Sequence, residues 1–267
     1  MGLVHTFLMR CNNCKVIATC RDVDSASDLH NLQRQFRDRV IPLCLDVTRD
    51  EQFDQVKQRI QEMGINTIDV LINNAAISNE EHPHDHVLTC RREELVEVFN
   101  TNVGGYMKLF QVFSDMLCNS QLRIAFVLSS RLGSLSGASS EGGTTAYRIS
   151  KAGINMLSVL FAQDGKIKES GVKVILNHPG HVDTYLGKTG GQQPKISVEQ
   201  SANSIVDLIE CAASVQLSQT QSGGKDNLGF QPSLEEISNR QDFQQFKQIL
   251  QSDNKVFVNY DGSILPF

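Results

Sequence analysis

The chain has 267 residues, of which 40% are hydrophobic and 21% charged, so it is long enough to bury a sizeable core, as one large α/β domain or two small ones. A formal net charge of −5 argues against a surface for nucleic acid or anionic lipid. No apolar run reaches the ~18 residues of a membrane span, and the opening lacks a signal sequence. Seven cysteines, scattered over predicted elements, indicate reduced thiols and a cytoplasmic protein.

Short apolar runs alternate with stretches of helical periodicity along most of the chain. The apolar runs predict strands at 15–20, 40–45, 68–72, 124–129, 172–176 and 255–260. The periodic stretches predict helices at 2–13, 26–37, 50–63, 92–117, 146–157 and 197–215. Ser25 is the predicted cap of the second helix, and Phe53, Val56 and Ile60 are the predicted inward face of the third.

This alternation predicts right-handed βαβ units and a doubly wound parallel sheet with helices on both faces. We expect a single domain over 1–267, with a Gln-, Ser- and Asn-rich polar insertion at about 216–254. Ligands bind such sheets at the carboxyl ends of the strands. Polar or turn residues follow the predicted strands at this edge: Arg21, Asp46, Asn73, Ser130 and Pro179-Gly180.

Tyr147 and Lys151 lie four residues apart, so on a helix they share one face. An ammonium beside a phenol lowers the pKa of the phenol, and such a tyrosine serves as a general acid or base near neutral pH. Ser130 ends its strand where it can donate to a carbonyl oxygen. The spacing alone is weak evidence, because an amphipathic helix with a surface Tyr and Lys has it too.

Several motifs together are more specific than this pair. In chain order they are Asp46-Val47, Asn73-Asn74-Ala75-Ala76, Asn102-Val103, Ser129-Ser130, Tyr147-x-x-x-Lys151 and Pro179-Gly180-x-Val182-x-Thr184. This series resembles the classical short-chain dehydrogenases/reductases. Ala146-Tyr-Arg-Ile-Ser-Lys-Ala152, His178-Pro-Gly180 and the terminal Asn259-Tyr-Asp-Gly-x-x-Leu-Pro266 resemble the sniffer-like carbonyl reductases and the bacterial C-factor branch.

The resemblance implies a Rossmann-like fold and four catalytic residues. Tyr147 would protonate the substrate carbonyl oxygen during hydride transfer, and Lys151 would bind the nicotinamide ribose and lower the tyrosine pKa. Ser130 would position the substrate, and Asn102 would hold a water in a proton relay.

The resemblance also implies a dinucleotide site. Its expected contacts are Gly2, Arg21, Asp46, Val47, Asn73, Ala75, Tyr147, Lys151, Pro179, Gly180, Val182 and Thr184. Arg21 follows the second strand of the family, where a guanidinium binds a 2′-phosphate. We therefore expect NADP rather than NAD, although the neighbouring Asp22 is the residue type that favours NAD.

The opening departs from the family pattern, which has a buried strand followed by Thr-Gly-x-x-x-Gly-x-Gly. Here the correspondence begins at the last glycine, Gly2. The absent strand lies between the strands at 15–20 and 68–72, so we expect two unpaired ladders unless these strands move together. A start-site artefact, a splice form and a decayed enzyme each account for this opening.

Two functions follow from these observations. The first is an NADPH-dependent oxidoreductase, active on small lipophilic aldehydes or ketones and forming a homodimer. The second is a catalytically impaired Rossmann-like protein that acts by dimerisation or partner binding, because the phosphate loop is missing.

Two further motifs are not assigned a function. His82-Pro-His-Asp-His86 has metal-binding residue types, but a polar loop without a fourth ligand is the better interpretation, and no metal is predicted. Cys11-Asn-Asn-Cys14 has redox spacing but lacks the strand–turn–helix context of thioredoxin.

Overall fold

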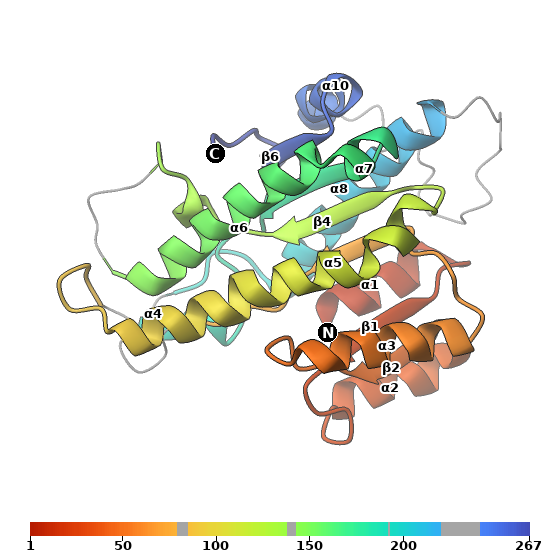
Figure 1. The fold of residues 1–267 in the computed structure, drawn as a ribbon, viewed down its shortest axis with the longest axis horizontal. Helices are drawn as coiled ribbons and strands as arrows, with labels where there is room; N and C mark the ends of the chain where they lie inside the picture. Colours follow the sequence, from red (N-terminus) through yellow and green to blue (C-terminus); the bar gives the residue numbers. More distant parts are fainter. Residues whose placement is uncertain (79–84, 138–142, 192, 220–240) are drawn as a thin grey trace.

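The computed structural model describes residues 1–78, 85–137, 143–191, 193–219 and 241–267. Helices and parallel strands alternate along these residues (Figure 1). The strands are β1 Val16–Cys20, β2 Val40–Cys44, β3 Val70–Asn73, β4 Ile124–Leu128, β5 Lys173–His178 and β6 Lys255–Asn259. The helices are α1 Gly2–Arg10, α2 Ser27–Phe36, α3 Asp50–Glu62, α4 Arg92–Phe99, α5 Gly105–Cys118, α6 Thr145–Gln163, α7 Gly165–Glu169, α8 Val198–Gln219 and α10 Gln244–Ser252. Shorter turns are η1 Arg37–Arg39, η2 Asn100–Gly104, η3 Arg131–Gly133, η4 Leu186–Gly191 and η5 Gln241–Phe243.

The strands form two sheets rather than one. β1 pairs only with β2, and the second sheet has the order β3-β4-β5-β6, with every pair parallel. β1 and β3 therefore keep their facing edges unpaired within the described residues. The expected break in the sheet is confirmed, and the alternative in which the two strands move together is wrong.

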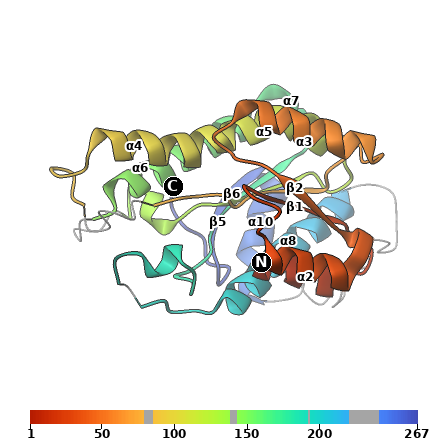
Figure 2. The ribbon, with the colours of Figure 1, turned by 90° about the horizontal axis from the view of Figure 1, so that it is seen from below.

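Helices cover both faces of the strands, as a doubly wound fold requires. Figure 2 shows α3, α4 and α5 on one side and α2 and α8 on the other, and α1 packs on α8. The strand β4 is almost fully buried and serves both cores, because alternate side chains point to opposite faces. Val127 packs with Phe53 and Phe110 on one side, while Phe126 packs with Ile209 on the other.

The helix α1 connects the two sheets. Its Phe7 belongs to the core beneath β4 and α8, whereas its neighbour Leu8 packs under β1 and β2. Arg10 then forms ion pairs with Asp207 at 2.5 Å and with the fully buried Glu210, both on α8. A buried carboxylate without such a partner is strongly destabilising, so these ion pairs fix α1 against α8.

Most predicted elements are confirmed with ends shifted by a few residues, and Phe53, Val56 and Ile60 are all buried. The helix predicted at 146–157 extends to Gln163. The predicted cap Ser25 is wrong: the N-cap of α2 is Ala26, while the Ser25 N–H donates to Asp22 instead.

The helix predicted at 92–117 is interrupted by the π-helical turn η2. Of the predicted insertion, residues 216–219 belong to α8 and 244–252 to α10, while 220–240 lie outside the described residues. Within the described part of the chain, every helix is too short or too polar to cross a membrane.

Candidate active site

Asn102 lies in the π-helical turn between α4 and α5 and is fully buried. Its Oδ1 accepts from the Ile77 N–H at 2.8 Å, and its Nδ2 donates to Ile77 O and to Ser150 Oγ, each at 2.9 Å. These bonds attach the segment after β3 to α6. π-helical turns are frequent at functional sites, and the water-holding role of Asn102 stays a prediction.

Ser130 and Tyr147 come together from separate elements. Ser130 follows β4, is buried, and accepts from the Leu132 N–H at 3.2 Å, which starts the turn η3. Tyr147 lies in the first turn of α6 and is partly buried. A hydrogen bond joins the two hydroxyls, as expected for a serine and a tyrosine that serve one substrate oxygen.

A close approach of η3 to α6 sets this geometry. A Cβ on Gly133 would lie 2.6 Å from the backbone carbon of Lys151, so only glycine fits there. Beside it, Ser129 Oγ donates to Asn155 Oδ1 at 2.5 Å, and Asn155 Nδ2 donates to Gly133 O at 3.1 Å. Asn155 therefore ties α6 to both ends of the segment that carries Ser130.

Lys151 extends from α6 toward the end of β4. Its Nζ donates to Leu128 O at 2.7 Å and lies 5.4 Å from the centroid of the Tyr147 ring. The side chain is buried, and burial lowers the pKa of Lys151 to about 7. The predicted shared face of Tyr147 and Lys151 is confirmed.

The predicted lowering of the tyrosine pKa is wrong for this chain. Burial raises the pKa of Tyr147 to about 12, and the hydrogen bond with Ser130 only partly opposes this effect. The reason is that Lys151 is itself removed from water, which disfavours the ammonium whose charge was expected to stabilise the phenolate. The Tyr147 phenol therefore keeps its proton at neutral pH.

Replacing Lys151 with Met is expected to stabilise the folded chain, most strongly at and below pH 7. The pKa of Lys151 is about 7 in the folded chain against 10.5 for an ordinary lysine. Between these values the unfolded chain binds a proton that the folded chain does not, so the parent gains stability as pH rises. We expect the melting temperature of Lys151→Met to exceed that of the parent by roughly 5 °C or more near pH 6–7.

The difference in melting temperature between Lys151→Met and the parent should shrink toward pH 10, where the lysine of the unfolded chain also loses its proton. Lys168→Met on α7 is the matched control, because Lys168 is exposed and should leave the melting temperature unchanged. A stabilisation by Lys151→Met that does not vary with pH would contradict the lowered pKa.

Arg21 and Asp46 follow the paired strands β1 and β2 and lie close to each other. Asp46 accepts from the Thr48 N–H at 3.0 Å and the Thr48 hydroxyl at 2.7 Å, and these bonds, with smaller contributions from the Arg49 and then the Arg21 charge, lower the pKa of Asp46. Arg21 is exposed. The neighbouring Val47 is pressed against α5, where a Cβ on Gly105 would lie 2.8 Å from Val47 Cβ.

Asn73 and Ala75 lie at the end of β3, beside the open edge of its sheet. Asn73 is buried, and its Nδ2 has no hydrogen-bond partner among the residues that the structure describes. Ala75 is exposed. A buried donor without an acceptor is rare in proteins, so Asn73 fits a bound group that carries acceptor oxygens.

The segment after β5 turns sharply at Gly180, whose φ is +86° and whose Cβ position is occupied by Ile196. Pro179 O accepts from Ser201 Oγ at 2.8 Å, and Val182 forms a bridge with Ile196. Thr184 is exposed and accepts from the Gly187 N–H at 3.0 Å.

Gly2, at the first turn of α1, packs on the start of α8, where its Cβ would lie 2.4 Å from Val198 Cγ1. The segment between β5 and α8 starts at the carboxyl end of β5 and leads into the first turn of α8. Gly2 packs on that turn and therefore lies near the carboxyl edge of the sheets. The structure therefore places the predicted contacts along the carboxyl edge, and their binding roles stay predictions.

Sequence reasoning missed two residues that position the site. Ser150 donates to Tyr147 O at 2.7 Å and receives the bond from Asn102. Asp85 accepts from the Thr145 N–H at 3.0 Å and so fixes the first turn of α6, two residues before Tyr147. Asp85 is 60 residues away from Thr145 in the chain, so no local pattern reports this contact.

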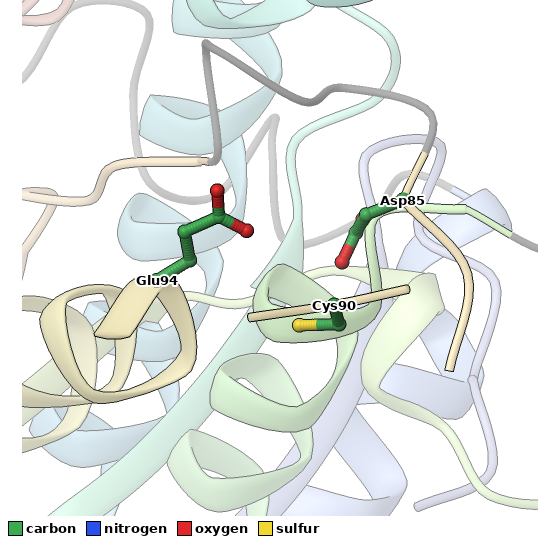
Figure 3. A group of neighbouring side chains, drawn as sticks. All are labelled: Asp85, Cys90 and Glu94. Atoms are coloured by element: carbon green, nitrogen blue, oxygen red, sulfur yellow. The ribbon is translucent and has the colours of Figure 1, made fainter. Parts of the chain in front are cut away.

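Asp85 also lies beside Cys90 and Glu94 (Figure 3), with the three polar atoms within 4.8 Å of one another. Burial first, and then the bond to Asp85, raises the pKa of Cys90 to about 11, which keeps the thiol protonated. Of the histidine motif, His86 forms a turn with Thr89, while residues 82 and 84 lie outside the described residues.

Known proteins resemble this chain in both sequence and fold. The chain is similar to the 1-hydroxy-2-glutathionyl-2-methyl-3-butene dehydrogenase of Rhodococcus sp. (strain AD45), with 31% identity over 204 residues, 68% of this chain and 85% of that protein. Two solved carbonyl reductases share its fold, and the match covers 100% of this chain with 93% of the first structure and 94% of the second. The NADPH-bound enzyme from chicken fatty liver has a TM-score of 0.75 and 22% identity. Sniffer of D. melanogaster has a TM-score of 0.71 and 23% identity.

The expected Rossmann-like fold and the expected family are thereby confirmed. The family model described as short chain dehydrogenase matches residues 2–195, the stretch that carries Ser130, Tyr147 and Lys151. The chain is therefore a member of the short-chain dehydrogenase/reductase family of oxidoreductases.

Proposed function

We propose that the protein is an NADPH-dependent oxidoreductase that reduces the carbonyl group of small lipophilic aldehydes or ketones. The observation that carries this proposal is the convergence of Ser130, Tyr147 and Lys151 at the carboxyl end of β4. The likeness to two carbonyl reductases supports this reaction type.

The three side chains have distinct roles in this reaction. The Tyr147 phenol, protonated at neutral pH, donates its proton to the substrate carbonyl oxygen. The Ser130 hydroxyl donates a hydrogen bond to the same oxygen and orients it. Lys151, held by Leu128 O, binds ribose hydroxyls, and the fraction that carries a proton at a pKa of about 7 stabilises the phenolate that remains after proton transfer.

The residues at the carboxyl edge fit a dinucleotide, which supplies the hydride when bound. Asn73 offers a buried donor without an acceptor in the described part of the chain, and Arg21 offers an exposed guanidinium suited to a 2′-phosphate. The chicken enzyme was solved with NADPH bound, which supports NADPH over NADH here.

Arg21→Glu is expected to shift the preference from NADPH toward NADH. A carboxylate at this position repels the 2′-phosphate of NADPH but accepts from a ribose hydroxyl of NADH. The measurement is kcat/KM for both cofactors. Arg34→Glu makes the same charge change on the exposed surface of α2 and should leave the ratio unchanged. An unchanged ratio in Arg21→Glu would remove Arg21 from the cofactor site.

The alternative function, a catalytically impaired protein acting by dimerisation or partner binding, rests on the open edges of β1 and β3. Titration with NADPH, followed by nicotinamide fluorescence, separates the two functions. Saturable binding followed by oxidation of NADPH with an aldehyde or ketone supports the reductase. Absence of binding supports the alternative.

We also propose that the protein forms a homodimer in the cytoplasm. Exposed apolar side chains gather on the packed pair α4 and α6: Val96, Phe99, Ile149, Met156 and Leu160. Such a patch marks an interaction surface, and all seven cysteines are free thiols, as in a reducing compartment. Light scattering of the parent and of Met156→Glu measures the oligomeric state.

A further inference from the structure

The turn between α1 and β1 brings two cysteines together. Residues 12 and 13 form this turn, and the Cys14 thiol donates to Cys11 O at 3.2 Å. The two side chains also hydrogen-bond each other, and the N–H groups of Asn13 and Cys14 donate to the Cys11 sulfur. Turn ends lie within about 7 Å at Cα, and disulfides need roughly 4.4–6.8 Å. The spacing of a turn therefore overlaps the spacing that a disulfide needs, and the hydrogen bond between the two side chains brings the sulfurs next to each other.

A guanidinium is fixed beside the second of these sulfurs. Arg39, from the turn before β2, donates through Nη2 to Leu8 O at 2.8 Å and to Cys11 O, and through Nε to Cys14 O at 3.2 Å. Its Nη2 also lies 4.0 Å from Cys14 Sγ. The three carbonyl bonds hold the charge in place whether or not the sulfurs are bonded.

These contacts divide the two cysteines into an attacking and a resolving thiol. The hydrogen bond from Cys11, followed by the contacts with Arg39, lowers the pKa of Cys14 against the opposing effect of burial. The same hydrogen bond and burial raise the pKa of Cys11. Cys14 is only partly buried, whereas Cys11 is 2% exposed. A reagent in solution therefore meets the Cys14 thiolate first.

We propose that Cys11 and Cys14 form a reversible dithiol–disulfide pair that is oxidised by small disulfides such as glutathione disulfide. The Cys14 thiolate attacks one sulfur of glutathione disulfide, the S–S bond breaks, and one glutathione leaves as a thiolate that takes a proton. Cys11 then loses its proton and attacks the Cys14 sulfur, which breaks the mixed disulfide and releases the second glutathione. Two protein thiols are oxidised by two electrons, and one glutathione disulfide is reduced to two thiols.

A second cysteine pair provides an internal comparison. Cys20 and Cys44 are opposite each other in the register of β1 and β2, but their thiols donate to different carbonyls, those of Asp22 and Arg21. Burial and the neighbouring Cys44 raise the pKa of Cys20. Cys44 is exposed, so accessibility alone predicts that this pair reacts first, whereas the geometry predicts that Cys11 and Cys14 do.

The experiment exposes the reduced full chain to graded ratios of oxidised to reduced glutathione at pH 7, followed by acid quenching, alkylation and mass spectrometry. Trypsin cuts after Arg10 and Lys15 and so releases both cysteines in one pentapeptide, 11–15. We expect this peptide to be lighter by two hydrogens, as a disulfide requires, at glutathione ratios where Cys20 and Cys44 are still reduced and are therefore alkylated. Oxidation of Cys20 or Cys44 first would overturn the proposal.

Three variants separate the attacking thiol from its partner. Cys11→Ser should accumulate one glutathione on Cys14, and Cys14→Ser should leave Cys11 unmodified. Arg39→Lys keeps the positive charge but loses the guanidinium that donates to the three carbonyls, and it should slow alkylation of Cys14 several-fold at pH 7. The order of attack would be contradicted if Cys11 in the Cys14→Ser variant took up glutathione as readily as Cys14 does in the Cys11→Ser variant. The two serine variants decide this even where Arg39→Lys fails to fold.

Discussion

Replacing Tyr147 with Phe is expected to abolish carbonyl reduction while leaving NADPH binding largely intact. The phenol is the group that hydrogen-bonds Ser130 and holds its proton at neutral pH, so its loss leaves the developing alkoxide without a proton donor. Loss of a general acid typically lowers the rate ~10²–10⁴-fold. The measurement is kcat from NADPH oxidation, together with the NADPH Kd from nicotinamide fluorescence, in any form of the chain that turns over.

Tyr106→Phe is the matched control for the lost hydroxyl. Tyr106 is buried in the core between α5 and α6, where its hydroxyl bonds Ser158 at 2.7 Å. This variant should lose some stability but keep turnover within a few-fold of the parent. If Tyr147→Phe also stays within a few-fold of the parent, Tyr147 is not the proton donor.

The sequence predicted those features that depend on local pattern. Phe53, Val56 and Ile60 repeat at helical spacing and are all buried, because periodicity alone decides which face of a surface helix meets the core. Ser130 was found because it ends an apolar strand, and such ends meet at one edge of a parallel sheet. Tyr147 and Lys151 followed from the spacing on a helix.

Features that depend on distant contacts were not predicted. The pKa of Tyr147 follows from its burial, which no sequence spacing reports. Asp85 reaches the start of α6 from a loop 60 residues earlier. The sequence around Cys11 and Cys14 lacks a thioredoxin context, and the cation beside the two cysteines comes from Arg39, 25 residues downstream of Cys14. The π-helical turn at Asn100–Gly104 changes the backbone bonding of one turn without a distinctive residue pattern.

Adding a typical family opening, a strand followed by Thr-Gly-x-x-x-Gly-x, ahead of Gly2 is expected to raise both the melting temperature and the NADPH affinity. β1 and β3 have unpaired facing edges, and a parallel strand between them would satisfy both, at about 0.5–1.5 kcal/mol for each bond. The glycine-rich turn would add backbone N–H donors for the pyrophosphate at the start of α1, each contributing about 1.5–3 kcal/mol. Thermal unfolding of both chains, with and without NADPH, measures the two effects.

Two control extensions separate the strand from the loop. An extension with the same strand but valines in place of the loop glycines should keep the higher melting temperature and lose most of the NADPH-induced shift, because side chains block the approach of the phosphates. An extension with proline at alternate strand positions should lose both gains, since proline lacks the N–H that pairs with β1 or β3. An equal melting temperature in the parent and the fully extended chain would mean that α1, through Phe7, Leu8 and Arg10, already holds the two sheets together as firmly as a paired strand does. An equal NADPH-induced shift would mean that the glycine-rich turn contributes nothing to cofactor binding.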